Sequence, residues 1–187
     1  MKKRILCYIL IFQVSYLLAN DSIKYSISLK MGPTIVPKNS ELEKGKYGFN
    51  AGYCFGRHFN NVLLITTINY SSCTLIEPDW FQDKYTEDVV NADLMIGYKY
   101  QESKVLIQFS AGVSYLFGNK HGKYIPPHGL FGSRGYENIR FSGYGWPIDF
   151  SMAYFIRDKV LLGLGYYLNT NKNYTYHSPY LIFTVNL

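Results

Sequence analysis

The sequence predicts an all-β fold: a closed, antiparallel, eight-stranded, up-and-down transmembrane β-barrel. Three observations lead to this prediction. Apolar and polar residues alternate with a period of two in eight segments, and the connections between these segments alternate between long and short. Aromatic residues make up 18% of the 187-residue chain, whereas charged residues make up only 17%. The chain is long enough for one domain with a substantial core.

The N-terminal segment, residues 1–19, is predicted to be a secretory signal peptide. Three cations at positions 2–4 precede an apolar run from Ile5 to Leu18, and Ala19 is a small residue suited to cleavage. This run of about 14 residues is too short to span a bilayer comfortably as a helix. The same three cations supply half of the net charge of +6, and the remaining sequence has no basic stripe typical of nucleic-acid binding. Residues 20–187 are therefore predicted to form the barrel domain.

Eight segments show the alternation that is typical of half-buried strands. The first is the clearest: residues 23–31 have an apolar side chain at every odd position and a small or polar one at every even position. The predicted strands are residues 23–32, 47–56, 64–71, 90–99, 105–115, 148–154, 162–168 and 181–187. An even number of antiparallel strands fits one closed sheet.

The connections have lengths that segregate to the two ends of the sheet. The long ones are residues 33–46, 74–88, 118–143 and 169–178, and the short ones are residues 57–61, 101–104 and 156–159. Tight periplasmic turns and longer extracellular loops are typical of outer-membrane barrels. This pattern places both termini in the periplasm.

One face of the predicted strands is continuously aliphatic and aromatic, and the other carries Gly, Ser, Asn, Lys and Asp. We predict that the apolar face is outside, with interfacial aromatics near the strand ends, such as Tyr47, Tyr70, Tyr98, Tyr115 and Phe117. The interior of an eight-stranded barrel is narrow, so charges there must pair. The predicted lumen charge network consists of Lys24, Lys30, Asp93, Lys99 and Asp149. Such an interior suits a plugged barrel better than a conducting pore.

The residue pattern predicts neither an enzyme nor a metal or cofactor site. His177 and Ser178 are adjacent, so on a strand they point to opposite faces and cannot form a base and nucleophile pair. The histidines at positions 121 and 128 lack further ligands for a metal. Cys54 and Cys73 are predicted to be free thiols facing the lumen, because a hairpin register separates them by about 26 Å.

In pattern and topology, residues 22–187 resemble the small eight-stranded bacterial outer-membrane β-barrels of the OmpA/OmpX type, within the porin-like outer-membrane proteins. The resemblance implies a Gram-negative or other diderm bacterium, delivery through the periplasm and insertion by the barrel-assembly machinery. Such chains usually end on an aromatic residue that helps this machinery recognise the last strand. This chain departs from that pattern because it ends on Leu187.

Two predicted loops carry opposite charge. Residues 74–88 contain five carboxylates and one lysine, whereas residues 118–143 contain Lys120, Lys123, Arg134 and Arg140 against Glu137. One interpretation is that the two loops pair with each other. The other is that the four basic residues form an anion-binding loop for lipopolysaccharide phosphates or an acidic host glycan, because exposed cations near a membrane attract anions.

The sequence thus predicts a non-enzymatic, monomeric outer-membrane barrel that stabilises the membrane and whose surface loops contact a host, matrix or lipid ligand. Its expected partners are outer-membrane lipids and lipopolysaccharide, and the assembly machinery during biogenesis. Three alternatives remain open: a lipid-modifying barrel enzyme, a soluble secreted barrel that binds a ligand, and a channel.

Overall fold

The computed structural model describes residues 24–37, 46–75, 86–125, 135–172 and 174–187. These residues form eight strands: β1 (Lys24–Val36), β2 (Lys46–Phe59), β3 (Val62–Leu75), β4 (Thr86–Glu102), β5 (Val105–Ile125), β6 (Gly135–Arg157), β7 (Val160–Asn171) and β8 (Tyr176–Asn186). The described residues contain no helix long and apolar enough to cross a membrane. The predicted signal peptide, residues 1–19, lies outside the described part of the chain.

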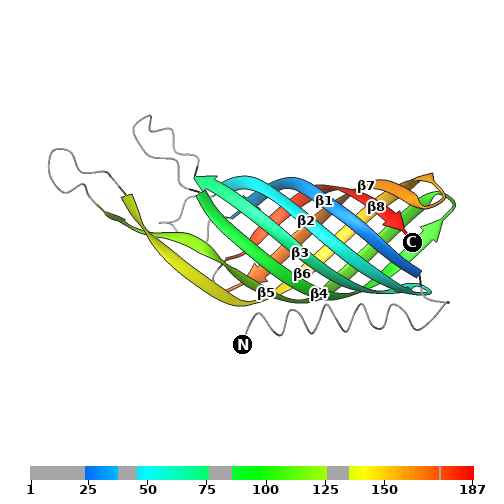
Figure 1. Ribbon diagram of the computed structural model, residues 1–187, viewed down its shortest axis with the longest axis horizontal. Helices are drawn as coiled ribbons and strands as arrows, with labels where there is room; N and C mark the ends of the chain where they lie inside the picture. Colours follow the sequence, from blue (N-terminus) through cyan, green and yellow to red (C-terminus); the bar gives the residue numbers. More distant parts are fainter. Residues whose placement is uncertain (1–23, 38–45, 76–85, 126–134, 173) are drawn as a thin grey trace.

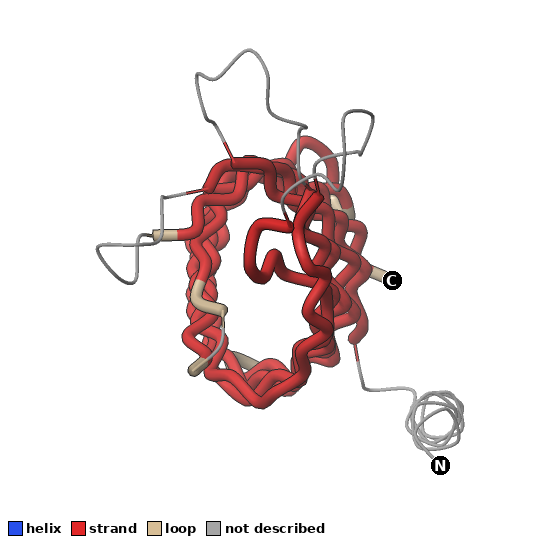
Figure 2. The backbone as a smooth tube through the Cα atoms, turned by 90° about the vertical axis from the view of Figure 1, so that its left-hand side faces the viewer, coloured by secondary structure: helices blue, strands red, loops and turns tan. Residues whose placement is uncertain are grey.

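The eight strands close into one barrel with up-and-down topology. Each strand pairs antiparallel with the next in the chain, and β8 pairs antiparallel with β1 (Figures 1 and 2). The predicted fold class is confirmed, and each of the eight predicted strands is present. Closure matters because it gives the first and last strands a hydrogen-bonding partner on both sides within the span of the barrel.

The tight turns lie at one end of the barrel together with the start of β1 and the end of β8. Two-residue turns at residues 60–61, 103–104 and 158–159 join β2 to β3, β4 to β5 and β6 to β7. Asn60 and Ser103 both have φ of 53°, a left-handed conformation that Asn adopts more readily than most residues. At the same end, the Leu187 N–H donates to the Tyr25 carbonyl at 2.8 Å. The segregation of short and long connections therefore follows the predicted pattern.

The long predicted loop at residues 118–143 is wrong as a loop over most of its length. β5 continues to Ile125 and β6 begins at Gly135, and the two strands pair as far as these ends, with a register shift between His121 and Tyr124. The hairpin projects beyond the rest of the barrel (Figure 1). Alternation does not reveal this extension because a projecting hairpin has no lipid on one face and no lumen on the other, so backbone hydrogen bonds form there without an apolar face.

The β1–β8 seam that closes the barrel contains two prolines facing each other. Met31 pairs with Leu181, and Ile35 pairs with His177 in the same register. Pro33 therefore lies opposite Pro179. Neither proline has an N–H to donate across the seam. The hydroxyl of Ser178 donates instead to the Pro33 carbonyl at 2.9 Å. The strands also lie close there: a Cβ on Gly32 would come within 2.0 Å of the Pro179 carbonyl oxygen.

The outer surface of the barrel is apolar along its full circumference. Large apolar side chains at alternate positions of every strand are exposed, among them Leu29, Met31, Phe49, Tyr53, Ile68, Leu94, Ile96, Phe109, Val113, Ile148, Phe150, Met152, Leu162, Leu164, Leu181 and Phe183. A water-soluble barrel would bury these side chains rather than expose them. The strands have 11 to 23 residues, and a tilted strand needs about ten to cross a bilayer. The outer face is therefore built to contact lipid.

A closed barrel with this surface should resist unfolding by SDS until it is heated. We expect the refolded protein to migrate at two positions on a gel, one for the unheated sample and a different one for the boiled sample, because opening the barrel breaks a continuous ring of interstrand hydrogen bonds. The same protein unfolded in urea and never refolded serves as the control and should give only the boiled position. A single position in all samples would contradict a closed barrel.

Candidate functional site

The lumen of the barrel is filled by side chains rather than open. Inward-facing positions carry small, polar and aromatic residues, and many of them are fully buried, including Thr34, Thr67, Asn69, Ser71, Asn91, Ser110, Asn169, Ser178 and Tyr176. The buried polar atoms are mostly bonded to one another across the barrel. The contents of the lumen form successive layers between the end with the long connections and the end with the tight turns.

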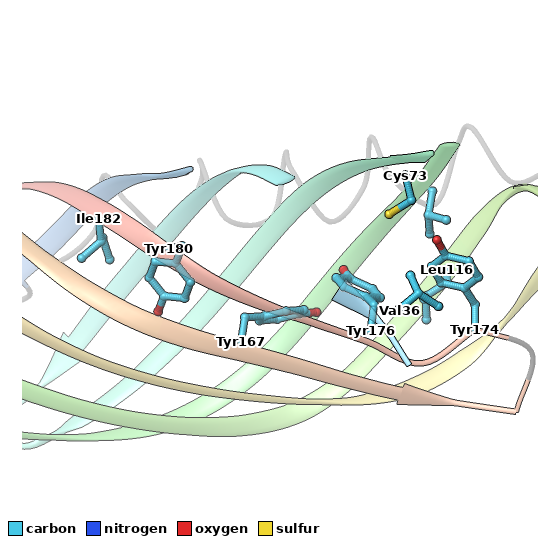
Figure 3. Packing of buried hydrophobic residues seen from close by; sticks show 9 residues of the cluster. Val36, Cys73, Leu116, Tyr167, Tyr174, Tyr176, Tyr180 and Ile182 are labelled. Atoms are coloured by element: carbon cyan, nitrogen blue, oxygen red, sulfur yellow. The ribbon is translucent and has the colours of Figure 1, made fainter. Parts of the chain in front are cut away.

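The layer nearest the long connections is mainly apolar and aromatic (Figure 3). Tyr174 and Tyr176 lie against side chains from four other strands, and the core cluster around them contains Val36, Cys73, Val89 and Leu116. Phe141, at the base of the β5–β6 hairpin, stacks on Tyr174 with ring centroids 5.6 Å apart. This contact joins the base of the hairpin to the contents of the lumen. At the rim, Lys46 donates to Glu87 at 2.6 Å.

Below this layer, Asp93 is held by neutral donors. Its carboxylate accepts hydrogen bonds from the amide of Asn69 at 3.0 Å, from the amide of Asn91 at 2.6 Å and from the hydroxyl of Tyr167 at 2.9 Å. The network continues because the Asn169 amide donates to Tyr167 at 2.9 Å. Three donors on one buried carboxylate supply the hydrogen bonds that it loses on leaving water.

The next layer contains a buried ion pair. The ammonium group of Lys30 donates to the carboxylate of Asp149, and the hydroxyl of Tyr180 donates to the same carboxylate. The Lys30 and Asp149 side chains are only 4% and 1% exposed. The ammonium also lies over the ring of Tyr180, 4.8 Å from its centroid. A buried pair of this kind is stable only when its remaining donors and acceptors are satisfied.

At the end with the tight turns, a small apolar cluster of Cys54, Leu63, Ile65 and Met95 is followed by a polar mouth. Lys99 lies 2.9 Å from Nδ1 of His58, and Nε2 of the same ring lies 2.8 Å from the Ser26 hydroxyl. An ammonium group only donates, so Nδ1 accepts and the hydrogen of the imidazole is on Nε2. The histidine in this arrangement is therefore neutral.

The predicted lumen charge network divides into three places in the structure. Lys30 and Asp149 pair with each other, and Asp93 lies in the separate amide and tyrosine network. Lys99 contacts His58 near the mouth, and Lys24 is exposed at the beginning of β1. Sequence reasoning did not find the three tyrosines at positions 167, 176 and 180 or the asparagines at positions 69, 91 and 169. The alternation of the strands could have revealed these residues, because each of them occupies a position on the polar face of its strand.

Two of the predicted anion-binding residues, Lys120 and Arg140, lie in the described part of the hairpin. Arg140 lies opposite Asn119, and Lys120 lies opposite Ile139. Opposite residues of an antiparallel pair point to the same face and consecutive residues to opposite faces, so Lys120 and Arg140 point to different faces of the hairpin. Arg140 is on the outward face, because its neighbour Phe141 packs on the lumen side. The side chain of Lys123 and the whole of Arg134 lie outside the described residues.

The two residues considered for catalysis lie on opposite faces of β8. The His177 ring contacts the Tyr166 hydroxyl at 2.7 Å, whereas Ser178 is buried and bonds to the Pro33 carbonyl. Cys54 and Cys73 are both buried and free, as predicted. Cys54 pairs with Thr67 of β3, because the turn is at Asn60 and Asn61. Within the described residues, no group of His, Cys, Asp and Glu has the arrangement of a metal site.

Comparisons with known proteins agree on the architecture. The sequence matches no family model and no curated protein. Among solved structures, Neisserial surface protein A (NspA) has a TM-score of 0.59 at 16% sequence identity, covering 88% of this chain and 99% of that protein. The chain has the fold of the small bacterial outer-membrane β-barrels. At this identity the likeness is one of fold.

Two further structures support the same fold. Ail, the attachment invasion locus protein of Yersinia pestis, in complex with the heparin analogue sucrose octasulfate, has a TM-score of 0.54 at 13% identity, covering 88% of this chain and 99% of that protein. The outer membrane protein OprG from Pseudomonas aeruginosa has a TM-score of 0.53 at 9% identity, with 87% and 95% covered. The architecture is therefore that of a membrane barrel.

The buried ion pair gives a testable consequence for stability. Lys30→Met should reduce the free energy of unfolding by about 3–5 kcal/mol, because it leaves the Asp149 carboxylate buried without its cation. Urea unfolding in lipid vesicles measures this change. The double variant with Asp149→Asn is the matched control and should recover most of the loss, since an amide still accepts from Tyr180. Equal stability of the single variant and the native protein would show that the pair does not hold the lumen together.

Proposed function

We propose that this chain is a non-enzymatic bacterial outer-membrane protein that stabilises the membrane and presents its β5–β6 hairpin to an anionic ligand outside the cell. The observation that carries the proposal is the contrast between a lumen filled by bonded side chains and a hairpin that projects from the barrel. Function at the projecting end requires no passage through the interior.

The outer-membrane location is supported by the apolar outer surface and by the shared fold. The tight turns, the start of β1 and the end of β8 lie at one end of the barrel, which corresponds to the periplasmic side of such proteins. The hairpin is then extracellular. Delivery by a signal peptide in residues 1–19, insertion by the barrel-assembly machinery and a monomeric state in a membrane that contains lipopolysaccharide belong to the same proposal.

A structural role without conduction follows from the contents of the lumen. Three layers cross the barrel at successive levels: Tyr174 with Tyr176, Asp93 with its amides, and Lys30 with Asp149. Separating the buried pair in a narrow, low-dielectric interior would cost several kcal/mol per ion. Planar bilayers containing the purified protein are therefore expected to show no stable ion conductance.

An anionic ligand fits the charge of the hairpin. Residues 118–143 carry four Lys and Arg residues against one Glu. Lys120 and Arg140, on different faces, lie in the part whose side chains are described. A protein with the same fold, Ail, has been crystallised with a sulfated heparin analogue, which supports a polyanion as the class of ligand. Phosphates of lipopolysaccharide present the same chemistry at the membrane surface.

Neutralising the hairpin cations should weaken polyanion binding. For Arg140→Gln and Lys120→Gln we expect each affinity for sucrose octasulfate, measured by isothermal titration calorimetry in detergent, to fall about fivefold, which corresponds to about 1 kcal/mol per cation. Raising the salt concentration should weaken binding of the native protein as well. Lys159→Gln, at the opposite end of the barrel, is the matched control and should leave the affinity unchanged. Equal effects at both ends, or no binding by the native protein, would refute the proposed role of the hairpin.

A further inference from the structure

The two strands of the projecting hairpin extend past the strands on either side of them. β4 pairs with β5 only from the turn up to Asp88 and Asn119. β7 pairs with β6 only up to Asn171 and Gly145, whereas β5 and β6 continue together to Ile125 and Gly135. Residues 135–144 of β6 therefore have β5 on one side and no paired strand on the other within the described part of the chain.

The backbone direction along β6 is fixed by three separate contacts. The Phe155 N–H donates to the carbonyl of Lys104, which directly precedes β5, so this odd-numbered residue points its backbone groups toward β5. The Trp146 and Tyr144 carbonyls instead accept from Thr170 and Asn171 on the β7 side. In an antiparallel strand these directions alternate residue by residue. Even-numbered residues of β6 therefore direct their N–H and C=O groups toward β7.

Pro147 provides an independent check on this direction. It is odd-numbered, so the N–H that it lacks would have pointed toward β5. The β5–β6 pairing is interrupted there, between Ala111 with Ile148 and Ser114 with Gly145, while the pairing of Pro147 with Asn169 on the β7 side is intact. The pairing is thus interrupted on the β5 side, toward which the alternation directs the backbone groups of odd-numbered residues.

The same alternation gives Asn138, Arg140 and Ser142 a backbone edge that no other strand pairs with among the described residues. These even-numbered residues lie beyond the end of β7, and all three are exposed. The register shift in this hairpin lies between His121 and Tyr124 of β5, so β6 keeps a regular strand geometry. Residues 135–144 contain no proline. The edge thus lacks the bulges and prolines with which proteins usually block strand addition.

We propose that residues 138–142 of β6 are a docking edge for an extended, acidic segment of another protein, which adds to the hairpin as a further β-strand. Backbone hydrogen bonds at Asn138, Arg140 and Ser142 would supply affinity in this mode of binding, and side chains at alternate positions would supply selectivity. The proposal rests on the extracellular position of the hairpin in the proposed function. It adds a polypeptide partner to the polyanion discussed above.

The acidic character of the partner follows from what an added strand would meet. A residue of the added strand opposite Arg140 would have its Cβ within about 5.5 Å of the Arg140 Cβ, a distance at which opposite charges attract and like charges repel. The hairpin as a whole is basic, with four cations against Glu137 over residues 118–143. An Asp or Glu opposite Arg140 is the complementary choice.

The same charge argues against a second copy of this chain as the occupant. Two hairpins meeting edge to edge would bring two basic segments together, with Arg140 of each copy near the cations of the other. Two upright barrels in one membrane would also direct their β6 strands the same way, so they would pair in parallel, which is less stable per residue than antiparallel pairing. An extended segment from a different protein has neither disadvantage.

The test uses the refolded full-length barrel and a synthetic peptide of roughly ten residues, matched to the length of a typical strand, in which Val and Glu alternate. Fluorescence anisotropy of the labelled peptide measures binding. The double variant Asn138→Pro with Ser142→Pro removes two edge N–H groups and places proline rings on the edge, a position where strands tolerate proline. The matched control, Asn138→Ala with Ser142→Ala, changes the same side chains but keeps both N–H groups.

We expect the peptide to bind the native protein and the alanine control with similar affinity, and to bind the proline variant at least about tenfold more weakly, as for the loss of two hydrogen bonds of about 1 kcal/mol each. A peptide of the same sequence with alternate backbone amides N-methylated should not bind. Arg140→Gln should weaken binding of the acidic peptide and leave binding of a Val and Thr peptide unchanged.

Binding of sucrose octasulfate separates this inference from the proposed function. The proline variant should keep native polyanion affinity and the native heat-dependent gel shift, which shows that its hairpin and barrel are intact. Equal peptide binding by the proline and alanine variants, or no peptide binding while polyanion binding persists, would overturn the docking edge alone. Self-association of the native barrel that the proline variant abolishes, measured by sedimentation, would overturn the choice of partner in favour of a second copy.

Discussion

The structure depends on one constraint: backbone N–H and C=O groups that lie in lipid must be hydrogen-bonded within the protein. Eight strands meet this constraint by closing into a ring, because closure gives β1 and β8 a partner that an open sheet would lack. The seam shows how strongly closure is maintained. Pro33 and Pro179 remove two donors at the same level, yet Ser178 supplies a side-chain hydrogen bond to the Pro33 carbonyl and the strands stay in one register.

Closing eight strands creates a narrow interior, and the narrowness determines what the lumen can contain. Side chains from opposite walls reach one another, so Asp93 is held by donors from β3, β4 and β7, and Lys30 of β1 reaches Asp149 of β6. Most of these polar groups are satisfied by side chains from other strands. The same contacts that stabilise the barrel therefore join its opposite walls through the lumen.

The requirement that backbone groups be hydrogen-bonded within the protein does not apply to the part of the hairpin that lies beyond the bilayer. Beyond Asn119 and Gly145, β5 and β6 continue without β4 and β7, which is possible because water can hydrogen-bond an edge that lipid cannot. The stack of Phe141 on Tyr174 anchors the base of this hairpin to the contents of the lumen. The barrel thus supports a two-stranded extension whose β6 strand has no paired neighbour on its second side among the described residues.

The sequence by itself determined the architecture. The period of two over segments such as residues 23–31, the apolar side chains on one face and the alternation of loop lengths are consequences of having lipid on one side and a narrow lumen on the other, so they could be read without coordinates. The free thiols of Cys54 and Cys73 followed from the predicted hairpin register, which places the two residues too far apart for a disulfide. Tertiary structure decided what depends on register between strands distant in the chain. Lys30 and Asp149 are 119 residues apart, and only the curvature of a closed barrel selects Asp149 rather than Asp93 as the partner of that lysine. The hairpin extension was likewise hidden, because a strand with water on both faces is held by backbone pairing and leaves no alternation in its side chains.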